Sequence, residues 1–235
     1  FNSCEWAVCT YAIYAEMHMW LVVDNSLMDY CGISVMLQGC DNAKFMNTYI
    51  SASIVPLSTF AGTPYYSSPP YAGVALFAKP GGVVPGTIPS SVQAHNCEFV
   101  NYQIHCDLPI VWINGYENST YPQGSTLNSF IDCMFLHPGG GLATGHSAPT
   151  ILRIQSALSV RVAFCRFRSP NLSTTMTSAW DAPATAEAVG FGNQYALCQQ
   201  SNVQVKSALD INPSQVYVQS ADPGNVPPGT IWVTP

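Results

Sequence analysis

Three charged residues that could act in catalysis lie in or next to a five-residue pattern that recurs along the chain. Glu98 and Arg166 occupy the second position of two copies, and Asp132 lies one residue before a third copy. Two carboxylates can hydrolyse a glycosidic bond, and a carboxylate with an arginine suits an elimination. If the chain is an enzyme, Glu98, Asp132 and Arg166 are therefore its catalytic candidates.

Aromatic side chains form a second candidate set, for ligand binding. They fall in or beside segments rich in Asn, Ser, Pro and Gly, at Tyr65, Tyr66, Tyr71, Tyr102, Trp112, Tyr116 and Tyr121. Exposed tyrosine among Asn and Ser is typical of surfaces that contact sugars or proteins. Filling a subunit interface is the alternative role for the same rings.

Metal and cofactor chemistry have no support in the sequence. The five histidines share no metal-ligand spacing, and no Cys-x-x-Cys pair occurs. The glycine run at 139–146 lacks the Lys-Ser/Thr that closes a phosphate loop. We therefore expect neither a metal site nor a cofactor.

The recurring pattern is small-x-Phe-x-polar. Its copies are Ala43–Asn47, Cys97–Asn101, Cys133–His137 and Cys165–Ser169, so their first residues are 54, 36 and 32 positions apart. The first and third residues are small or apolar and the second varies, which is the period of a strand with one buried face. Repeats of about this length favour a solenoid, in which equivalent residues of successive turns stack.

If successive turns of a solenoid stack, each position of the pattern has a predicted location, either inside, outside or at a bend. The phenylalanines are expected inside, as a column of Phe45, Phe99, Phe135 and Phe167. The second residues are expected on one outer stripe, formed by Lys44, Glu98, Met134 and Arg166. Met134 then separates Glu98 from Arg166, so ordinary solvated side chains are the alternative to a catalytic patch. Asn47 and Asn101 are expected at bends, where a carboxamide can bond to nearby backbone.

Short apolar runs broken by Gly, Pro, Asn and Ser predict an all-β chain, with 17 Gly and 18 Pro in total. We predict a parallel β-helix over residues 1–205, with insertions at about 55–91 and 170–192, then a C-terminal strand and tail over 206–235. The first insertion rests on its prolines, which are too many for central strands. A β-sandwich is the alternative fold.

Composition limits the partners. Hydrophobic residues make up 48% of the 235, enough for a core, whereas charged residues make up only 9%, against about 25% in an ordinary globular protein. So much neutral surface favours burial in a homo-oligomer. A net charge of −6 with seven Lys plus Arg leaves no basic stripe for nucleic acid or for an anionic membrane.

Nine cysteines cannot all pair within one chain. Three of them, Cys97, Cys133 and Cys165, begin copies of the pattern, which directs them inward as small buried groups. We expect free thiols made in a reducing cytoplasm. Paired cysteines and a glycan at Asn118 would instead indicate an extracellular protein.

Two segments resemble a known family. Gly39–Asn47 and Asn96–Asn101 are similar to rungs of the pectate-lyase-like right-handed parallel β-helix, and the similarity spans about Cys31 to Val205. It implies a single-stranded right-handed parallel β-helix with long loop insertions. The low charge and the closing Pro227–Val233 resemble phage tailspike and tail-fibre chains, which are homotrimers.

These features together predict a viral structural protein, either a phage tailspike, a tail fibre or another capsid-surface component, that serves host attachment or virion stability. It would be a homotrimer made in the host cytoplasm and located in the virion, beside other virion proteins and in contact with a host surface glycan. Nucleic acid and membrane are not expected partners. Two alternatives stay open: a glycan depolymerase, hydrolase or lyase, and a secreted carbohydrate-binding or adhesin module.

Overall fold

The computed structural model consists of strands and their connections throughout the part of the chain that it describes. The described residues are 1–17, 20–52, 73–81, 89–101, 108–113, 125–137, 150–155, 157–169, 178–182, 187–197, 216–218 and 231–233. Their strands are β1 (Glu5–Ala7), β2 (Tyr11–Glu16), β3 (Val22–Asp24), β4 (Leu27–Cys31), β5 (Ile33–Gln38), β6 (Ala43–Met46), β7 (Tyr49–Ala52), β8 (Leu76–Lys79), β9 (Val92–His95), β10 (Glu98–Asn101), β11 (Val111–Ile113), β12 (Ser125–Ile131), β13 (Met134–Leu136), β14 (Thr150–Ile154), β15 (Ala157–Ala163), β16 (Arg166–Ser169), β17 (Ser178–Asp181), β18 (Glu187–Phe191), β19 (Gln194–Leu197), β20 (Val216–Val218) and β21 (Ile231–Val233). Over these residues the chain forms no helix, and so none that is long and apolar enough to cross a membrane.

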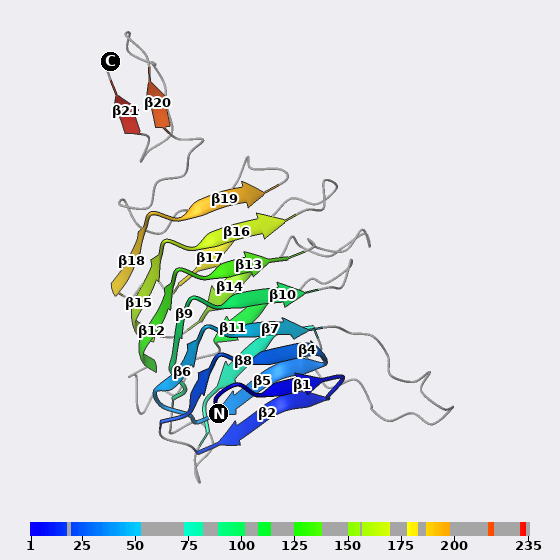
Figure 1. The fold of residues 1–235 in the computed structure, drawn as a ribbon. Helices are drawn as coiled ribbons and strands as arrows, with labels where there is room; N and C mark the ends of the chain where they lie inside the picture. Colours follow the sequence, from blue (N-terminus) through cyan, green and yellow to red (C-terminus); the bar gives the residue numbers. More distant parts are fainter. Residues whose placement is uncertain are drawn as a thin grey trace, which may run out of the picture.

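Three parallel sheets stack these strands in chain order. Sheet A contains β3, β6, β9, β12, β15 and β18; sheet B contains β1, β4, β7, β10, β13, β16 and β19; sheet C contains β2, β5, β8, β11, β14 and β17. The chain passes from B to C to A and returns to B one position further along (Figure 1). The arrangement is consistent with a parallel β-helix, and we call one passage through the three sheets a rung. Because all pairings between the described strands are parallel, the β-sandwich alternative, with its antiparallel neighbours, is wrong.

The apolar core is formed by side chains that point inward from the strands of all three sheets. In sheet B, Phe99 pairs with Phe135 and Phe135 with Phe167. Their rings are stacked nearly parallel, with centroids 5.2 Å and 4.8 Å apart, and all three are fully buried. The predicted column of stacked phenylalanines is confirmed for these three residues.

Phe45 does not belong to that column. It lies in β6 of sheet A, where it is in register with Val23 and Ala94. Lys44 for the same reason is not on the stripe of Glu98, whose partner in the preceding rung is Tyr49. Only two residues separate β6 in sheet A from β7 in sheet B, so strands of both sheets show a similar alternation of buried and exposed residues. The sequence alone therefore did not show which of the two sheets Ala43–Met46 joins.

The ranges predicted as insertions contain strands of the sheets. β8 lies within 55–91 and pairs with both β5 and β11, with Leu76 and Ala78 fully buried. Pro80 follows this strand instead of interrupting it, so the prolines of the range do not prevent pairing. β17 and β18 likewise lie within 170–192.

The predicted C-terminal tail contains a second strand. The C-terminal strand predicted within 206–235 corresponds to β20, which pairs in parallel with β21. These two strands form a sheet of their own. The range 206–235 therefore contains two paired strands, where the sequence predicted one strand and a tail.

Candidate functional site

Sheets A and B meet at a two-residue corner in each rung. The first corner residue has a positive φ of 46° to 68° at Ser3, Asn25, Asn47, Asn96, Asp132, Phe164 and Gly192. Glycine, asparagine and aspartate tolerate this left-handed geometry best. Asn47 is confirmed as a bend residue. Asn101 is the last residue of β10 and is buried. Its carboxamide bonds to backbone, as predicted, by donating from Nδ2 to the Gly73 carbonyl at 2.7 Å.

A groove of about 450 Å³ runs over the outside of this corner. It crosses the four successive corners that begin at Asn47, Asn96, Asp132 and Phe164. Its lining consists of Asn47, Thr48, Asn96, Cys97, Glu98, Asp132, Cys133, Met134, Phe164 and Arg166. Residues up to 119 positions apart in the sequence therefore share one surface, because the corner recurs in every rung.

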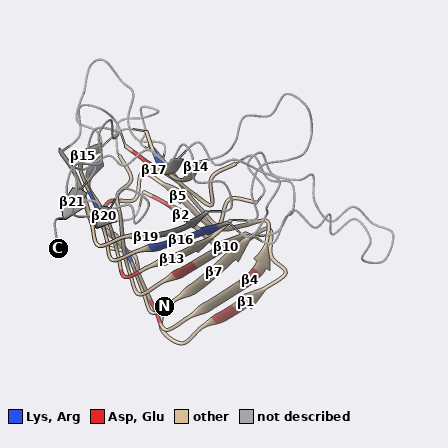
Figure 2. Cartoon of the chain, turned by 90° about the horizontal axis from the view of Figure 1, so that it is seen from above, with Lys and Arg blue, Asp and Glu red and all other residues tan. Residues whose placement is uncertain are grey.

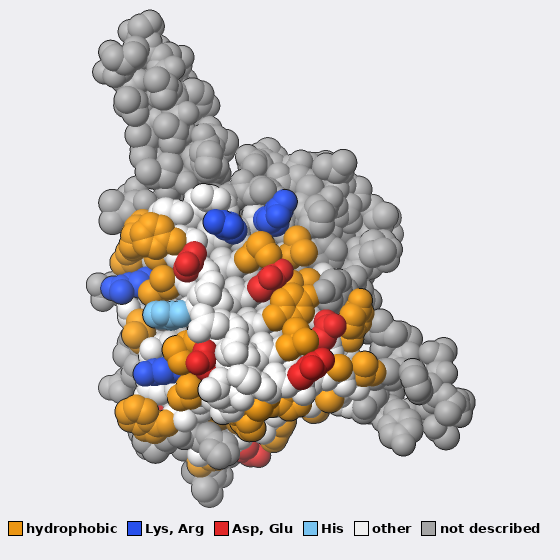
Figure 3. Space-filling model, viewed as in Figure 1, with side chains coloured by type: hydrophobic (Ala, Val, Ile, Leu, Met, Phe, Trp, Pro, Cys, Tyr) orange, Lys and Arg blue, Asp and Glu red, His pale blue; other side chains and the backbone are white. Residues whose placement is uncertain are grey.

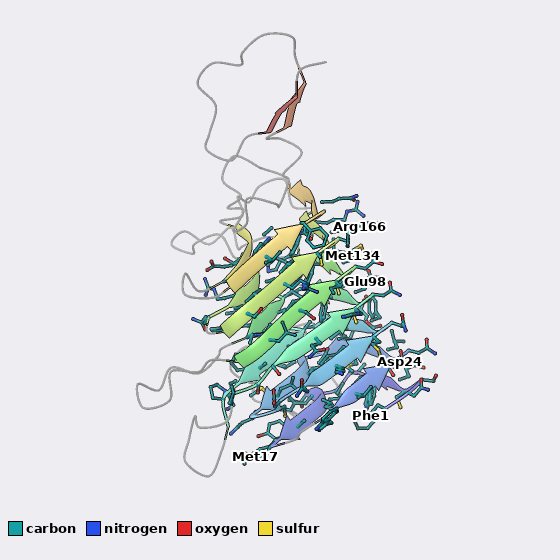
Figure 4. The ribbon with its side chains drawn as sticks, turned by 90° about the vertical axis from the view of Figure 1, so that its left-hand side faces the viewer. Phe1, Met17, Asp24, Glu98, Met134 and Arg166 are labelled. Atoms are coloured by element: carbon teal, nitrogen blue, oxygen red, sulfur yellow. The ribbon has the colours of Figure 1, made fainter. Side chains whose placement is uncertain are left out.

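The groove brings together the three charged candidates from the sequence. Glu98 pairs with Met134 and Met134 pairs with Arg166, so the predicted order along the stripe is confirmed. Figure 4 shows the side chains of Glu98, Met134 and Arg166 in successive rungs along one edge of the stack. Two strand steps place Glu98 and Arg166 about 10 Å apart at Cα. Asp132 begins the corner that leads to Met134.

Glu98 has the most distinctive electrostatics of the lining residues. Its side chain is half-buried, whereas Asp132 and Arg166 are exposed. Burial raises the pKa of the Glu98 carboxyl above its ordinary value of 4.5. This carboxyl therefore keeps its proton to a higher pH than an ordinary glutamic acid, as a proton donor must.

The floor of the groove is formed by buried thiols. Cys97 and Cys133 are almost fully buried, and each Sγ donates to the carbonyl two residues earlier, His95 and Ile131 respectively, at 3.3 Å. A hydrogen bond with the Cys133 thiol, and then burial, raises the pKa of Cys97. Burial, and then a hydrogen bond with Cys165 in the next rung, raises that of Cys133. The thiols therefore stay protonated and form a neutral floor.

An amide ladder forms one wall of the groove. Asn96 donates from Nδ2 to Oδ1 of Asn47 at 2.9 Å, and Asn47 donates from Nδ2 to Oδ1 of Asp24 at 3.0 Å. Each bond joins the corner of one rung to the rung before it. The ladder fixes the orientation of both carboxamides although their side chains are exposed.

Phe164 closes the groove at its later end. Its side chain is 52% exposed, and its φ of 55° is unusual for a bulky residue. The ring packs edge to face on Phe191, with centroids 4.8 Å apart. Sequence analysis missed this residue, since Phe164 can be recognised as the counterpart of Asn47, Asn96 and Asp132 only once the corners are aligned.

Trp112 is the one aromatic candidate among the described residues, and it lies on another sheet. It belongs to β11 of sheet C, its ring centroid is 5.3 Å from that of Phe77, and Nε1 donates to Oε1 of Gln155 at 2.6 Å. It packs against a cluster of Ile33, Met36, Val74 and Phe77. It therefore packs on sheet C, away from the groove, and ligand binding by Trp112 stays a prediction. The other aromatic candidates lie outside the described residues: Tyr65, Tyr66, Tyr71, Tyr102, Tyr116 and Tyr121.

Charge is sparse and divided along sheet B. Acidic side chains occur on β1, β4 and β10, and basic ones on β16 (Figure 2). Figure 3 shows that these charges stand apart among hydrophobic and neutral side chains. The described residues include no group of three His, Cys, Asp or Glu side chains that could hold a metal ion. The groove therefore offers hydroxyl-binding and carboxylate chemistry on a largely neutral surface.

Comparisons with models of known protein families, with curated proteins and with solved structures found no match to this chain.

Proposed function

We propose that this chain is a structural protein of a virus particle, a phage tailspike, tail fibre or other capsid-surface component, that serves attachment to a host surface glycan or virion stability. The observation that carries the proposal is the stacking of three parallel sheets, each in chain order, around one apolar core. Such a stack is stiff along its axis and repeats the same outer positions at each rung, as a display scaffold requires. The coil is taken as right-handed and pectate-lyase-like, as the sequence resemblance implies.

Exposed apolar corners support a role in contact with other molecules. Five bulky residues with positive φ are all well exposed, namely Val8, Met17, Trp20, Tyr30 and Phe164. Apolar groups exposed at or beside the outer corners of a soluble protein favour contact with another subunit or a ligand. With only 9% charged residues, the chain fits a homotrimer within a virion, where neighbouring subunits cover exposed apolar positions such as Val8 and Met17.

Solution mass and glycan incubation test this proposal together. Light scattering should give three times the chain mass of 25.3 kDa. Incubation with a panel of purified bacterial surface polysaccharides should release no fragments. A monomer that adsorbs to no bacterial strain of a broad panel would contradict the proposal.

A glycan depolymerase is the second candidate, because Glu98 and Asp132 line the same groove and burial raises the pKa of Glu98. One carboxyl would protonate the leaving oxygen while the other acts as base or nucleophile. Release of oligosaccharides by the wild type, lost in Glu98→Gln and in Asp132→Asn, would establish it. Glu5→Gln, on the same outer stripe but in the first rung, is the matched control and should keep full activity.

A further inference from the structure

We infer that the corner groove binds a short neutral oligosaccharide, with Phe164 as the platform for one sugar ring. This inference rests on the proposed attachment function and names the class of ligand for it. Its starting point is the size of the groove. A volume of about 450 Å³ lies within the usual range of ligand sites, and four corners at the strand spacing give a length of about 14 Å.

The polar wall of the groove suits hydroxyl groups. The ladder engages one N–H of Asn96 and one of Asn47, and each carboxamide carries a second N–H. Glu98 and Asp132 are acceptors beside these donors. A sugar hydroxyl both donates and accepts, so a lining that combines amides and carboxylates matches it. Because the ladder already holds the amides in place, less conformational freedom is lost on binding.

Phe164 supplies the apolar surface that a sugar ring also needs. Its ring is fixed by Phe191 and by the backbone of Gly192, which leaves no room for a Cβ. More than half of the side chain remains exposed at the end of the groove. An immobilised, exposed aromatic ring next to hydrogen-bonding groups binds the C–H face of a pyranose with little entropic cost.

Charge favours a neutral ligand over an acidic one. The lining has two carboxylates, Glu98 and Asp132, and one guanidinium, Arg166. The chain as a whole has a net charge of −6. A polyuronate or a nucleic acid would meet more repulsion than attraction in such a groove. Arg166 and the carboxylates can instead each bond to hydroxyl oxygens or hydrogens of an uncharged sugar.

The test compares two aromatic variants in binding to defined oligosaccharides. Phe164→Asn removes the platform and installs the residue found at the equivalent corners 47 and 96, so it should fold normally. Trp20→Ala removes an even more exposed ring at a different corner, outside the groove. The probes are neutral gluco-, galacto-, manno- and xylo-oligosaccharides, with oligogalacturonate as the charged comparison. Binding is detected by saturation-transfer NMR and quantified by calorimetry.

At least one neutral probe should bind, and Phe164→Asn should weaken it about tenfold while Trp20→Ala leaves it unchanged. Preference for oligogalacturonate, equal affinity of Phe164→Asn and wild type, or no binding of any neutral probe would overturn the inference. Adsorption to bacterial cells distinguishes a failure of the groove assignment from a failure of the proposed attachment function. If Phe164→Asn adsorbs as well as wild type, the groove assignment fails alone; if oligosaccharide binds in the groove but no strain adsorbs the protein, the attachment role fails alone.

Discussion

The ring of Phe164 lies directly on the backbone of Gly192, so closely that a Cβ at position 192 would stand 2.7 Å from Cδ1 of Phe164. The two residues occupy the same corner position in successive rungs, with φ values of 55° and 68°. The exposed ring at the end of the groove is therefore possible only because the next corner has a glycine.

Gly192→Ala should lower the free energy of unfolding by about 2 kcal/mol, since the left-handed backbone disfavours a side chain by about 1–2 kcal/mol and the ring must also move. Urea unfolding measures the change. The double variant with Phe164→Asn removes the contact but keeps the backbone strain, and it should recover part of the loss. Equal stability of Gly192→Ala and wild type would show that the two residues are not in contact.

Asn96→Ala should destabilise the fold by about 1–2 kcal/mol, because it removes the bond to Asn47 and places alanine at a φ of 50°. Asn96→Gly removes the same bond but tolerates the backbone, so its loss should be smaller. Thermal and urea unfolding of both variants separate the two contributions. If the two variants are equally destabilised, backbone geometry at the corner contributes nothing.

Phe135→Ala should cost about 3–5 kcal/mol, because the ring is fully buried between Phe99 and Phe167. Phe135→Leu keeps most of the apolar volume and should cost much less. Phe191→Ala, at a partly exposed position, is the comparison for losing a surface ring. The order of urea midpoints, with Phe135→Ala lowest, checks the stacked core.

Stability should depend on pH through Glu98. Burial raises its pKa above 4.5 in the folded state, so the folded protein keeps a proton that the unfolded chain has already released. As the pH rises from 4.5 to the folded-state pKa, the unfolding free energy of wild type should fall relative to that of Glu98→Gln, and the difference should then stay constant. Urea midpoints between pH 4 and pH 8 measure this. Glu5→Gln is the control. If the urea midpoint of wild type changes with pH relative to Glu5→Gln as it does relative to Glu98→Gln, net charge and not burial of Glu98 explains the effect.

Alkylation should sort the cysteines by burial. Free thiols occur at Cys4, Cys9, Cys31, Cys97 and Cys133, and burial raises the pKa of Cys31 to about 11. In native protein at pH 8, iodoacetamide should modify the partly buried Cys4 and Cys9 long before Cys31, Cys97 or Cys133. Peptide mapping by mass spectrometry gives the order. Protein that resists alkylation even when unfolded would have disulfides and would support the secreted alternative.

The sequence by itself determined the local pattern. Alternation around Phe99, Phe135 and Phe167 predicted strands with one buried face, and their common spacing to the preceding cysteine predicted that they stack. It also placed Glu98, Met134 and Arg166 in the correct order. These features depend only on neighbours along the chain and on register, which a period of two specifies strongly.

Only the tertiary structure decided which sheet each pattern joins. Ala43–Met46 has the same alternation as the strands of sheet B but lies on the other side of a corner, and β8 was hidden among prolines. The groove likewise depends on corners 32 to 49 residues apart in the chain, among them Phe164, whose type gives no local sign of a bend. Connections between strands vary in length without changing the stack, so sequence spacing alone does not show which turns coincide; hydrogen bonding between rungs does.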